Sequence, residues 1–175
     1  VYKRQVADGR DRWAPFPDAA TYFNLVAYTH AGSFEVREVV EAANRQNGFV
    51  FWNHPSFDAP WAELNEFHAG LVEDNLLHGV EIANGSRYYE NAHRLALEHD
   101  LVLVGVSDIH GLIDWAFEPH AGGHRPVTLV FAEEPTAESL REAMFARRTV
   151  VWWEEMLIGR ERELEALMDA SLTVE

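Results

Sequence analysis

The sequence predicts an α/β fold in which short buried strands alternate with helices. Short apolar runs recur after residue 20, and segments with apolar residues three or four positions apart separate them. The run at 101–106 is apolar throughout, which is typical of a strand buried on both faces. Parallel strands need helical crossovers of this kind. We therefore expect a parallel sheet, and the pattern leaves both a barrel and an open doubly wound sheet possible.

The first half of the chain is predicted to hold three strands, at 24–28, 49–52 and 80–83. Between the first two, Ser33 is a favoured helix-capping residue, and apolar residues follow it at i, i+3, i+4 and i+7. Asn47 and Gly48 then supply a helix end. The apolar stripe of this helix consists of Val36, Val39, Val40 and Ala43.

Two more helices are predicted on either side of the strand at 80–83. Pro60 suits the first turn of a helix. That helix would run through Trp61, Leu64 and Leu71. Ser86 would cap the second helix. The apolar face of that second helix would consist of Tyr88, Ala92, Leu95 and Ala96.

The second half continues the alternation with strands at 101–106, 127–131 and 149–152. Thr136 is predicted to cap a helix between the last two strands. That helix would run through Leu140, Ala143 and Met144. A final helix at 160–170 would turn Leu164, Leu167 and Met168 toward the core.

Length and charge limit the classes of function. The chain has 175 residues, of which 29 are acidic and 14 basic, giving a formal net charge of −15. This length suits one domain with a buried core. The charge argues against a protein that neutralises nucleic-acid phosphates and against one that docks on anionic membrane. We expect no nucleic-acid partner.

The chain has nine histidines and no cysteine. The lack of cysteine excludes disulfides, thiolate zinc sites and a cysteine nucleophile, so any metal must be bound by His, Asp or Glu. The opening stretch contains no apolar segment of a signal peptide, and the run at 101–106 is far too short to span a membrane. The compartment and the oligomeric state stay open.

Polar residues follow three of the predicted strands at the point where each strand ends. The strand at 49–52 runs into Asn53-His54-Pro55, the strand at 80–83 into Asn84-Gly85-Ser86, and the strand at 101–106 into Ser107–Gly111. In parallel α/β folds the carboxyl ends of the strands line the active site. The sequence therefore places Asn, His and Asp side chains on one edge of the sheet.

Asp108 and His110 are candidate metal ligands. Continuing the two-residue alternation of an extended strand past Val106 puts both side chains on one side. Carboxylate and imidazole together suit Zn²⁺, Mn²⁺ or Fe²⁺. The alternative is that Asp108 caps the next helix and His110 is an ordinary turn residue.

His54 and Glu81 are candidates on the neighbouring strands. Pro55 is expected to hold His54 in an extended conformation at its strand end. The alternative for His54 is a buried histidine bonded to backbone. Glu81 sits inside an apolar strand, where a charge is costly unless it is paired or bound to metal. The alternative for Glu81 is an edge strand with this side chain facing solvent.

Asn84 and Arg125 are weaker candidates. The Asn84 amide either faces a ligand or belongs to an Asn-Gly turn, and we favour the turn. Arg125 follows a glycine-rich loop, and its planar guanidinium suits a substrate phosphate or carboxylate. The alternative is that Arg125 only offsets the acidic surface.

Four segments, taken in their order and spacing, carry a resemblance to a known family. They are FVFWNHPSF, GVEIANGSRYYENA, LVLVGVSDIHG and HRPVTLVFA. From about residue 20 onward the chain resembles the polymerase and histidinol phosphatase (PHP) family, in particular its stand-alone bacterial phosphoesterase branch.

The resemblance implies the C-terminal part of a distorted (β/α)₇ barrel that hydrolyses phosphoesters with two or three divalent metal ions. It implies metal ligands at His54, Asp108 and His110, with Glu81 and Asn84 near the site, and a small phosphorylated substrate. Arg125 would then hold the phosphate. Two or three such ions would add about +4 to +6 at the site, so the acidic composition does not exclude a phosphate substrate.

The sequence also departs from the family pattern. The His-x-His motif that opens the family barrel does not occur, and Tyr22 stands where relatives carry a histidine. We therefore expect one PHP-like domain over 1–175 that lacks its first strands. Residues 1–20 would be poorly defined, 21–153 would hold the barrel elements and 154–175 a C-terminal helix. The alternative function is an inactive or incomplete PHP-like domain with a binding or structural role.

Overall fold

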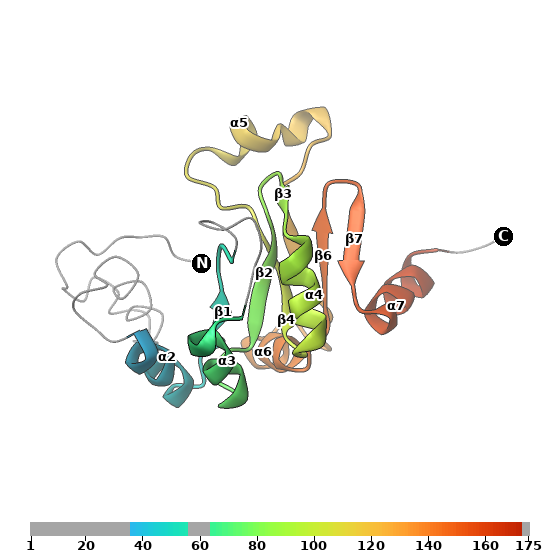
Figure 1. Ribbon diagram of the computed structural model, residues 1–175. Coiled ribbons are helices and arrows are strands. Elements are labelled where there is room, and N and C mark those ends of the chain that lie inside the picture. The colour runs from blue at the N-terminus through green and yellow to red at the C-terminus, as the bar shows by residue number, and fades with distance from the viewer. Residues whose placement is uncertain (1–35, 56–63, 173–175) are drawn as a thin grey trace.

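The computed structural model describes residues 36–55 and 64–172, which form two sheets flanked by helices (Figure 1). The predicted strand at 24–28, Tyr22 and the predicted helix start at Pro60 lie outside the described residues. The elements, in chain order, are α2 (Val36–Arg45), β1 (Phe51–Trp52), α3 (Glu66–Glu73), β2 (Gly79–Asn84), β3 (Arg87–Tyr88), α4 (Glu90–Glu98), β4 (Val102–Val106), α5 (Ile113–Phe117), the short 3₁₀ helix η1 (Pro119–Ala121), β5 (Val127–Val130), α6 (Ala137–Phe145), β6 (Thr149–Trp153), β7 (Met156–Gly159) and α7 (Glu161–Ser171).

The first sheet confirms the predicted parallel arrangement for three strands. Strand β2 lies between β1 and β4 and pairs with both in parallel, with Trp52 opposite Val80 and Val80 opposite Leu103. The short strand β3 folds back antiparallel on the end of β2. Because β2 has a neighbour on each side, the alternative that Glu81 sits on an edge strand is wrong.

The second sheet corrects the expectation of a wholly parallel fold. Strands β5, β6 and β7 are antiparallel, and β6 and β7 are joined by a tight turn in which Glu154 takes a φ of 48°. The Thr149 hydroxyl donates to the Leu103 carbonyl at 3.1 Å, and the Thr128 hydroxyl donates to the Gly105 carbonyl at 3.0 Å. Threonine hydroxyls of β5 and β6 thus bond to the backbone of β4. In a closed barrel, backbone hydrogen bonds between neighbouring strands would join the two sheets instead. The described residues form no closed barrel.

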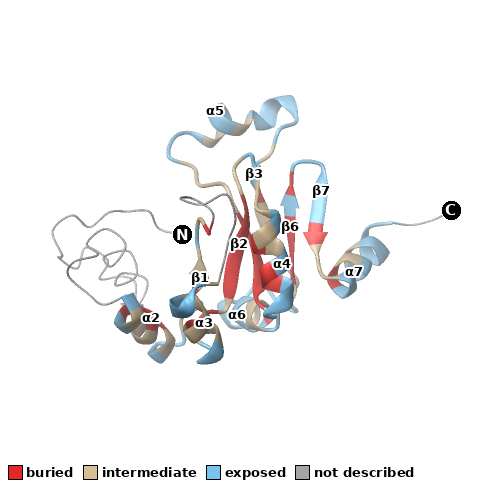
Figure 2. Ribbon diagram, in the orientation of Figure 1, coloured by how far each residue is buried: buried red, intermediate tan, exposed pale blue. Residues whose placement is uncertain are grey.

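The core lies along β2 and β4 and the helix that covers them. Figure 2 shows the buried residues running along these two strands. Val80, Ile82 and Leu103 are fully buried. Helix α4 contacts β2 and β4, and its buried residues Ala92, Leu95 and Ala96 belong to the same core. The predicted stripe of α2 is confirmed at Val39, Val40 and Ala43, whereas Val36 is exposed. None of the helices in the described ranges is long and apolar enough to cross a membrane.

Two helix starts differ from the prediction. Helix α3 begins at Glu66 and is capped by Asn65, whose side chain accepts from the His68 backbone N–H. Ser86 does not cap a helix, because Gly85 and Ser86 form the turn between β2 and β3, and α4 begins only at Glu90. A φ of 54° at Gly85 permits this turn. The predicted Thr136 cap is confirmed, because the hydroxyl accepts from the Ser139 backbone N–H at 3.2 Å.

The C-terminal part contains more than the predicted helix. Strand β7 precedes α7, so 154–175 begins with half of a β-hairpin. Within α7, Met168 is exposed rather than inward, and Glu163 is buried. The helix contacts β6 and β7, and Leu164 and Leu167 are half-buried.

Gly105 on β4 is expected to tolerate no side chain. A Cβ atom there would lie 2.4 Å from Cγ1 of Val151, which is fully buried on β6. We expect Gly105→Ala to lower the free energy of unfolding by about 1–3 kcal/mol, the usual cost of overpacking a core. Urea denaturation measures this loss. Val151→Ala in the same background should restore part of it, and equal stability of Gly105→Ala and wild type would contradict the close approach of β4 and β6.

Candidate active site at the carboxyl ends of the strands

Four polar side chains gather where β1, β2 and β4 end. They are His54, Glu81, Asn84 and Asp108, and we refer to them as the strand-end cluster. His54 follows β1 by two residues, Asp108 follows β4 by two residues, and Glu81 and Asn84 belong to β2, which lies between those strands. His54, Asn84 and Asp108 come from the three predicted strand ends, Glu81 joins them from within β2, and His110 is not part of the cluster.

Glu81 is the buried centre of the cluster. Its side chain is 0% exposed. Its Oε1 atom accepts from the His54 backbone N–H at 3.2 Å and from the Asn84 amide at 3.1 Å, and it lies 3.2 Å from His54 Nδ1. Its Oε2 atom is buried and has no hydrogen-bond partner among the described residues. Burial raises the pKa of the Glu81 carboxyl, against the opposing effects of Asn84 and His54.

A β-bulge in β2 brings Asn84 to the same side as Glu81. The register between β2 and β4 shifts between Glu81 and Ala83. Without the shift, strand alternation would turn residues three apart to opposite faces. With it, the Asn84 amide donates to Glu81 Oε1, and its nitrogen lies 3.0 Å from His54 Nδ1. Asn84 therefore ends the strand before the turn at Gly85 and also has a side chain in the cluster.

The His54 ring connects Glu81 to Asp108. Its Nδ1 atom faces Glu81, and its Nε2 atom lies 3.9 Å from Asp108 Oδ1. When Nδ1 carries the proton and donates it to Glu81, the lone pair of Nε2 is directed toward the Asp108 side. The His54 side chain is 20% exposed and that of Asp108 is 25% exposed, whereas the Asp108 Oδ1 atom itself is buried. The alternative of a His54 bonded only to backbone is wrong, because its ring contacts are side chains.

The backbone at both strand ends is left-handed rather than extended. The φ angle is 51° at His54 and 49° at Asp108. The prediction that Pro55 holds His54 extended is therefore wrong, and so is the continued alternation through Asp108. Non-glycine residues in this region cost of order 1–3 kcal/mol and concentrate at functional sites. Here the two turns direct His54 and Asp108 toward each other.

Asp108 and His110 do not follow the two-residue alternation of an extended strand, because Asp108 takes a left-handed backbone. Asp108 does not cap the next helix, since α5 begins after Leu112 with no side-chain cap. His110 is exposed on the loop that leads to α5. No group of three or more His, Asp or Glu side chains within residues 36–55 and 64–172 is arranged to hold a metal ion. The assignment of His110 as a ligand thus stays a prediction.

Arg125 lies beside a separate cavity next to α5. The cavity has a volume of about 230 Å³. Its lining residues are Ile113, Phe117, Pro119, Gly123, His124, Arg125, Val127 and Trp152. Figure 1 shows α5 beyond the carboxyl ends of β2 and β4. The role of Arg125 in holding substrate stays a prediction.

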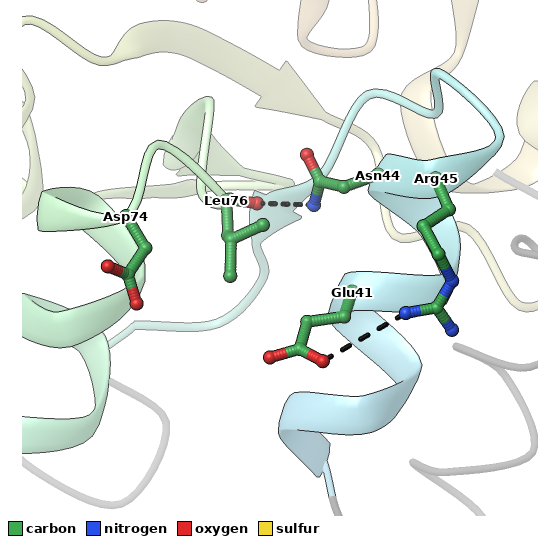
Figure 3. A pocket seen from close by; sticks show the side chains of 5 residues that line it. All are labelled: Glu41, Asn44, Arg45, Asp74 and Leu76. Carbon is green, nitrogen blue, oxygen red and sulfur yellow. Dashed lines mark hydrogen bonds and ion pairs between the residues drawn. The ribbon is translucent and has the colours of Figure 1, made fainter.

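A larger hollow, of about 480 Å³, lies at the opposite edge of the first sheet (Figure 3). It is lined by the end of α2 and by the segment that enters β2. Its polar groups bond to one another: Asn44 donates to the Leu76 carbonyl at 3.0 Å, and Arg45 lies 4.0 Å from Glu41. The amino ends of parallel strands rarely hold an active site, and every buried polar side-chain atom of the five described residues that line this hollow has a hydrogen-bond partner. We assign the chemistry to the strand-end cluster instead.

The described chain is thus a mixed α/β protein with a histidine–carboxylate cluster at the carboxyl ends of parallel strands. Among solved structures, it is similar to a two-domain protein from Bacteroides vulgatus that contains a predicted PHP-like metal-dependent phosphoesterase. The two are 34% identical, the match covers 82% of this chain, and the TM-score is 0.77. The chain spans 43% of the length of that protein. No family model and no curated protein matches the chain.

Proposed function

We propose that this chain is a metal-dependent phosphoesterase of the PHP type, with the strand-end cluster as its active site. The observation that carries the proposal is that the His54 ring contacts Glu81 through Nδ1 and faces Asp108 through Nε2, at the carboxyl edge of the sheet. The similarity to a protein with a predicted PHP-like metal-dependent phosphoesterase supports the same chemistry. The proposed fold is the C-terminal part of the PHP barrel.

The donor atoms of the cluster suit a divalent ion. His54 Nε2 and the buried Asp108 Oδ1 lie 3.9 Å apart. Imidazole nitrogen and carboxylate oxygen are preferred by Zn²⁺, Mn²⁺ and Fe²⁺. The buried Glu81 Oε2 atom, which no described residue satisfies, is a further oxygen donor whose burial is costly without a positive partner. We assign His54 and Asp108 as ligands and keep His110 as a third.

The residues of this chain have separate tasks in the proposed reaction. Glu81 holds the His54 ring through its Nδ1 atom, and Asn84 orients the Glu81 carboxylate. A divalent ion bound there would lower the pKa of a water molecule and offset the negative charge of the phosphoryl group. Arg125 is proposed to contact substrate. The substrate is proposed to be a small phosphorylated compound, because the net charge of −15 opposes binding along a polyanion.

Hydrolysis of p-nitrophenyl phosphate tests this function. We expect the chain to release p-nitrophenol when supplied with Mn²⁺, Zn²⁺ or Fe²⁺, and to lose this activity with EDTA, because phosphoryl charge must be offset at the site. Readdition of the same ion should restore it. Bound metal is counted by elemental analysis after gel filtration. Absence of both metal binding and hydrolysis under anaerobic and aerobic loading would contradict the proposal and favour a binding or structural role.

A further inference from the structure

We propose that Arg87 binds the phosphoryl group of the substrate at the strand-end cluster. This inference rests on the proposed function, and it assigns a substrate-binding residue on the β2–β3 hairpin. The hairpin is the short turn in which β3 returns along the end of β2 (Figure 1). The Arg87 guanidinium would supply the positive charge and the paired N–H donors that a phosphate requires.

The strand register places Arg87 beside the cluster. In the antiparallel pair of β2 and β3, Asn84 lies directly opposite Arg87. Side chains of directly opposite residues project from the same face of a sheet, with Cβ atoms about 4.5–5.5 Å apart. The Asn84 side chain points to Glu81 and His54. Arg87 therefore leaves the backbone on the face that carries the cluster.

Tyr89 provides a second indication of where the guanidinium lies. Burial raises the pKa of the Tyr89 hydroxyl above 10.0, the Glu81 carboxylate raises it further, and the Arg87 guanidinium acts in the opposite direction. A single half-buried hydroxyl is thus within electrostatic reach of both groups. The pKa of Tyr89 thus responds to both the Arg87 guanidinium and the Glu81 carboxylate, which agrees with the strand register that puts Arg87 on the side of the cluster.

The Arg87 guanidinium interacts with the Tyr89 hydroxyl but has no acidic partner in the described ranges. Most arginines in the described ranges form ion pairs with acidic side chains; these are Arg37, Arg45, Arg94, Arg147, Arg148, Arg160 and Arg162. Within the same described ranges Arg87 forms no ion pair, and it is exposed. The chain has a net charge of −15, so most of its arginines in these ranges are offset by acidic neighbours. Arg87 has no such ion pair among the described residues, and its positive charge therefore suits an incoming anion.

The chemistry favours Arg87 for the phosphoryl oxygens. A guanidinium can donate two parallel N–H bonds to two non-bridging oxygens of a phosphate. Lysine offers a point charge without this geometry. Arg87→Lys should therefore retain part of the binding, whereas Arg87→Gln should remove the charge and the paired donors together.

Two measurements on the full chain test the inference. The first is the dissociation constant for inorganic phosphate, by calorimetry with Mn²⁺ present. The second is KM and kcat for p-nitrophenyl phosphate. We expect Arg87→Gln to weaken phosphate binding and to raise KM at least tenfold, with Arg87→Lys intermediate and Mn²⁺ affinity unchanged. Arg94→Gln is the matched control, because Arg94 pairs with Glu98 on the exposed face of α4. Arg94→Gln should match wild type in both measurements.

The outcomes separate this inference from the proposed function. If wild type binds phosphate and Arg87→Gln weakens that binding, the inference holds even where no hydrolysis is found. If wild type binds or hydrolyses phosphate compounds and Arg87→Gln behaves as Arg94→Gln does, the inference is wrong and the proposed function stands. If wild type binds no phosphate, with or without Mn²⁺, the inference is wrong as well.

Discussion

Replacing Asp108 by asparagine is expected to reduce phosphoester hydrolysis about 10³-fold or more. The substitution keeps the size of the side chain but removes the negative charge that faces His54 Nε2 at 3.9 Å. Loss of a metal ligand removes several kcal/mol of transition-state stabilisation, and each 1.4 kcal/mol corresponds to a factor of ten. His54→Ala should have an effect of similar size. The measurement is kcat/KM for p-nitrophenyl phosphate at saturating Mn²⁺.

The control for this prediction makes the same chemical change nearby. Asp114 is exposed on α5, six residues further along the chain, and Asp114→Asn should leave kcat/KM within twofold of wild type. Thermal unfolding of both variants checks that each is folded. Because φ is 49° at Asp108 and asparagine tolerates this conformation well, Asp108→Asn should not lower stability. Unchanged turnover in Asp108→Asn would contradict the assignment of Asp108 as a ligand.

Glu81→Gln is expected to weaken the binding of Mn²⁺ or Zn²⁺ about 10–100-fold, the usual cost of removing a carboxylate that orients a metal-bound histidine. Glu81 Oε1 faces three donors, namely the His54 backbone N–H, the His54 ring and the Asn84 amide. A glutamine has one acceptor oxygen, and its NH₂ group is a donor. If that NH₂ group faced the three donors, it would meet no acceptor there. The ring of His54 would then lose its fixed tautomer.

Two readouts separate this positioning role from a structural one. The ¹⁵N chemical shifts of the His54 ring should change from a single tautomer to a mixture, and metal affinity should fall by competition with a chromogenic chelator. The free energy of unfolding should be unchanged or higher, because a neutral amide costs less to bury than a carboxylate. Glu163→Gln is the matched control, since Glu163 is also buried but lies on α7. Equal metal affinity in Glu81→Gln and Glu163→Gln would contradict the role of Glu81.

Most of the element types were predictable because each follows from a local pattern. The stripe of Val39, Val40 and Ala43 identifies α2, and the apolar run of β4 identifies a strand with covered faces. The hairpins were missed for a local reason too. The sequence predicts a turn at Asn84-Gly85 but a helix cap at Ser86, although a two-residue turn containing glycine joins strands equally well.

The candidate site was predictable in composition but not in geometry. Polar residues after three buried strands predicted that His54, Asn84 and Asp108 would lie on one edge, since parallel strands end there, and Glu81 was a candidate only as a charge inside an apolar strand. The sequence pattern did not reveal that His54 and Asp108 would both take a left-handed backbone. Nor did it reveal the bulge that brings Asn84 to Glu81, because a bulge shows no distinct residue pattern in this strand.

The sequence by itself determined which chemistry is open to this protein: an α/β fold, metal ligation without cysteine, and an acidic surface that disfavours nucleic acid. Only the tertiary structure decided which donors meet. Local patterns depend on neighbours along the chain, whereas the cluster depends on the register of β2 against β1 and β4 and on one register shift. The register of β2 against β3 likewise places Arg87 opposite Asn84. That pairing depends on the turn at Gly85 and Ser86, and the sequence pattern did not predict a hairpin there.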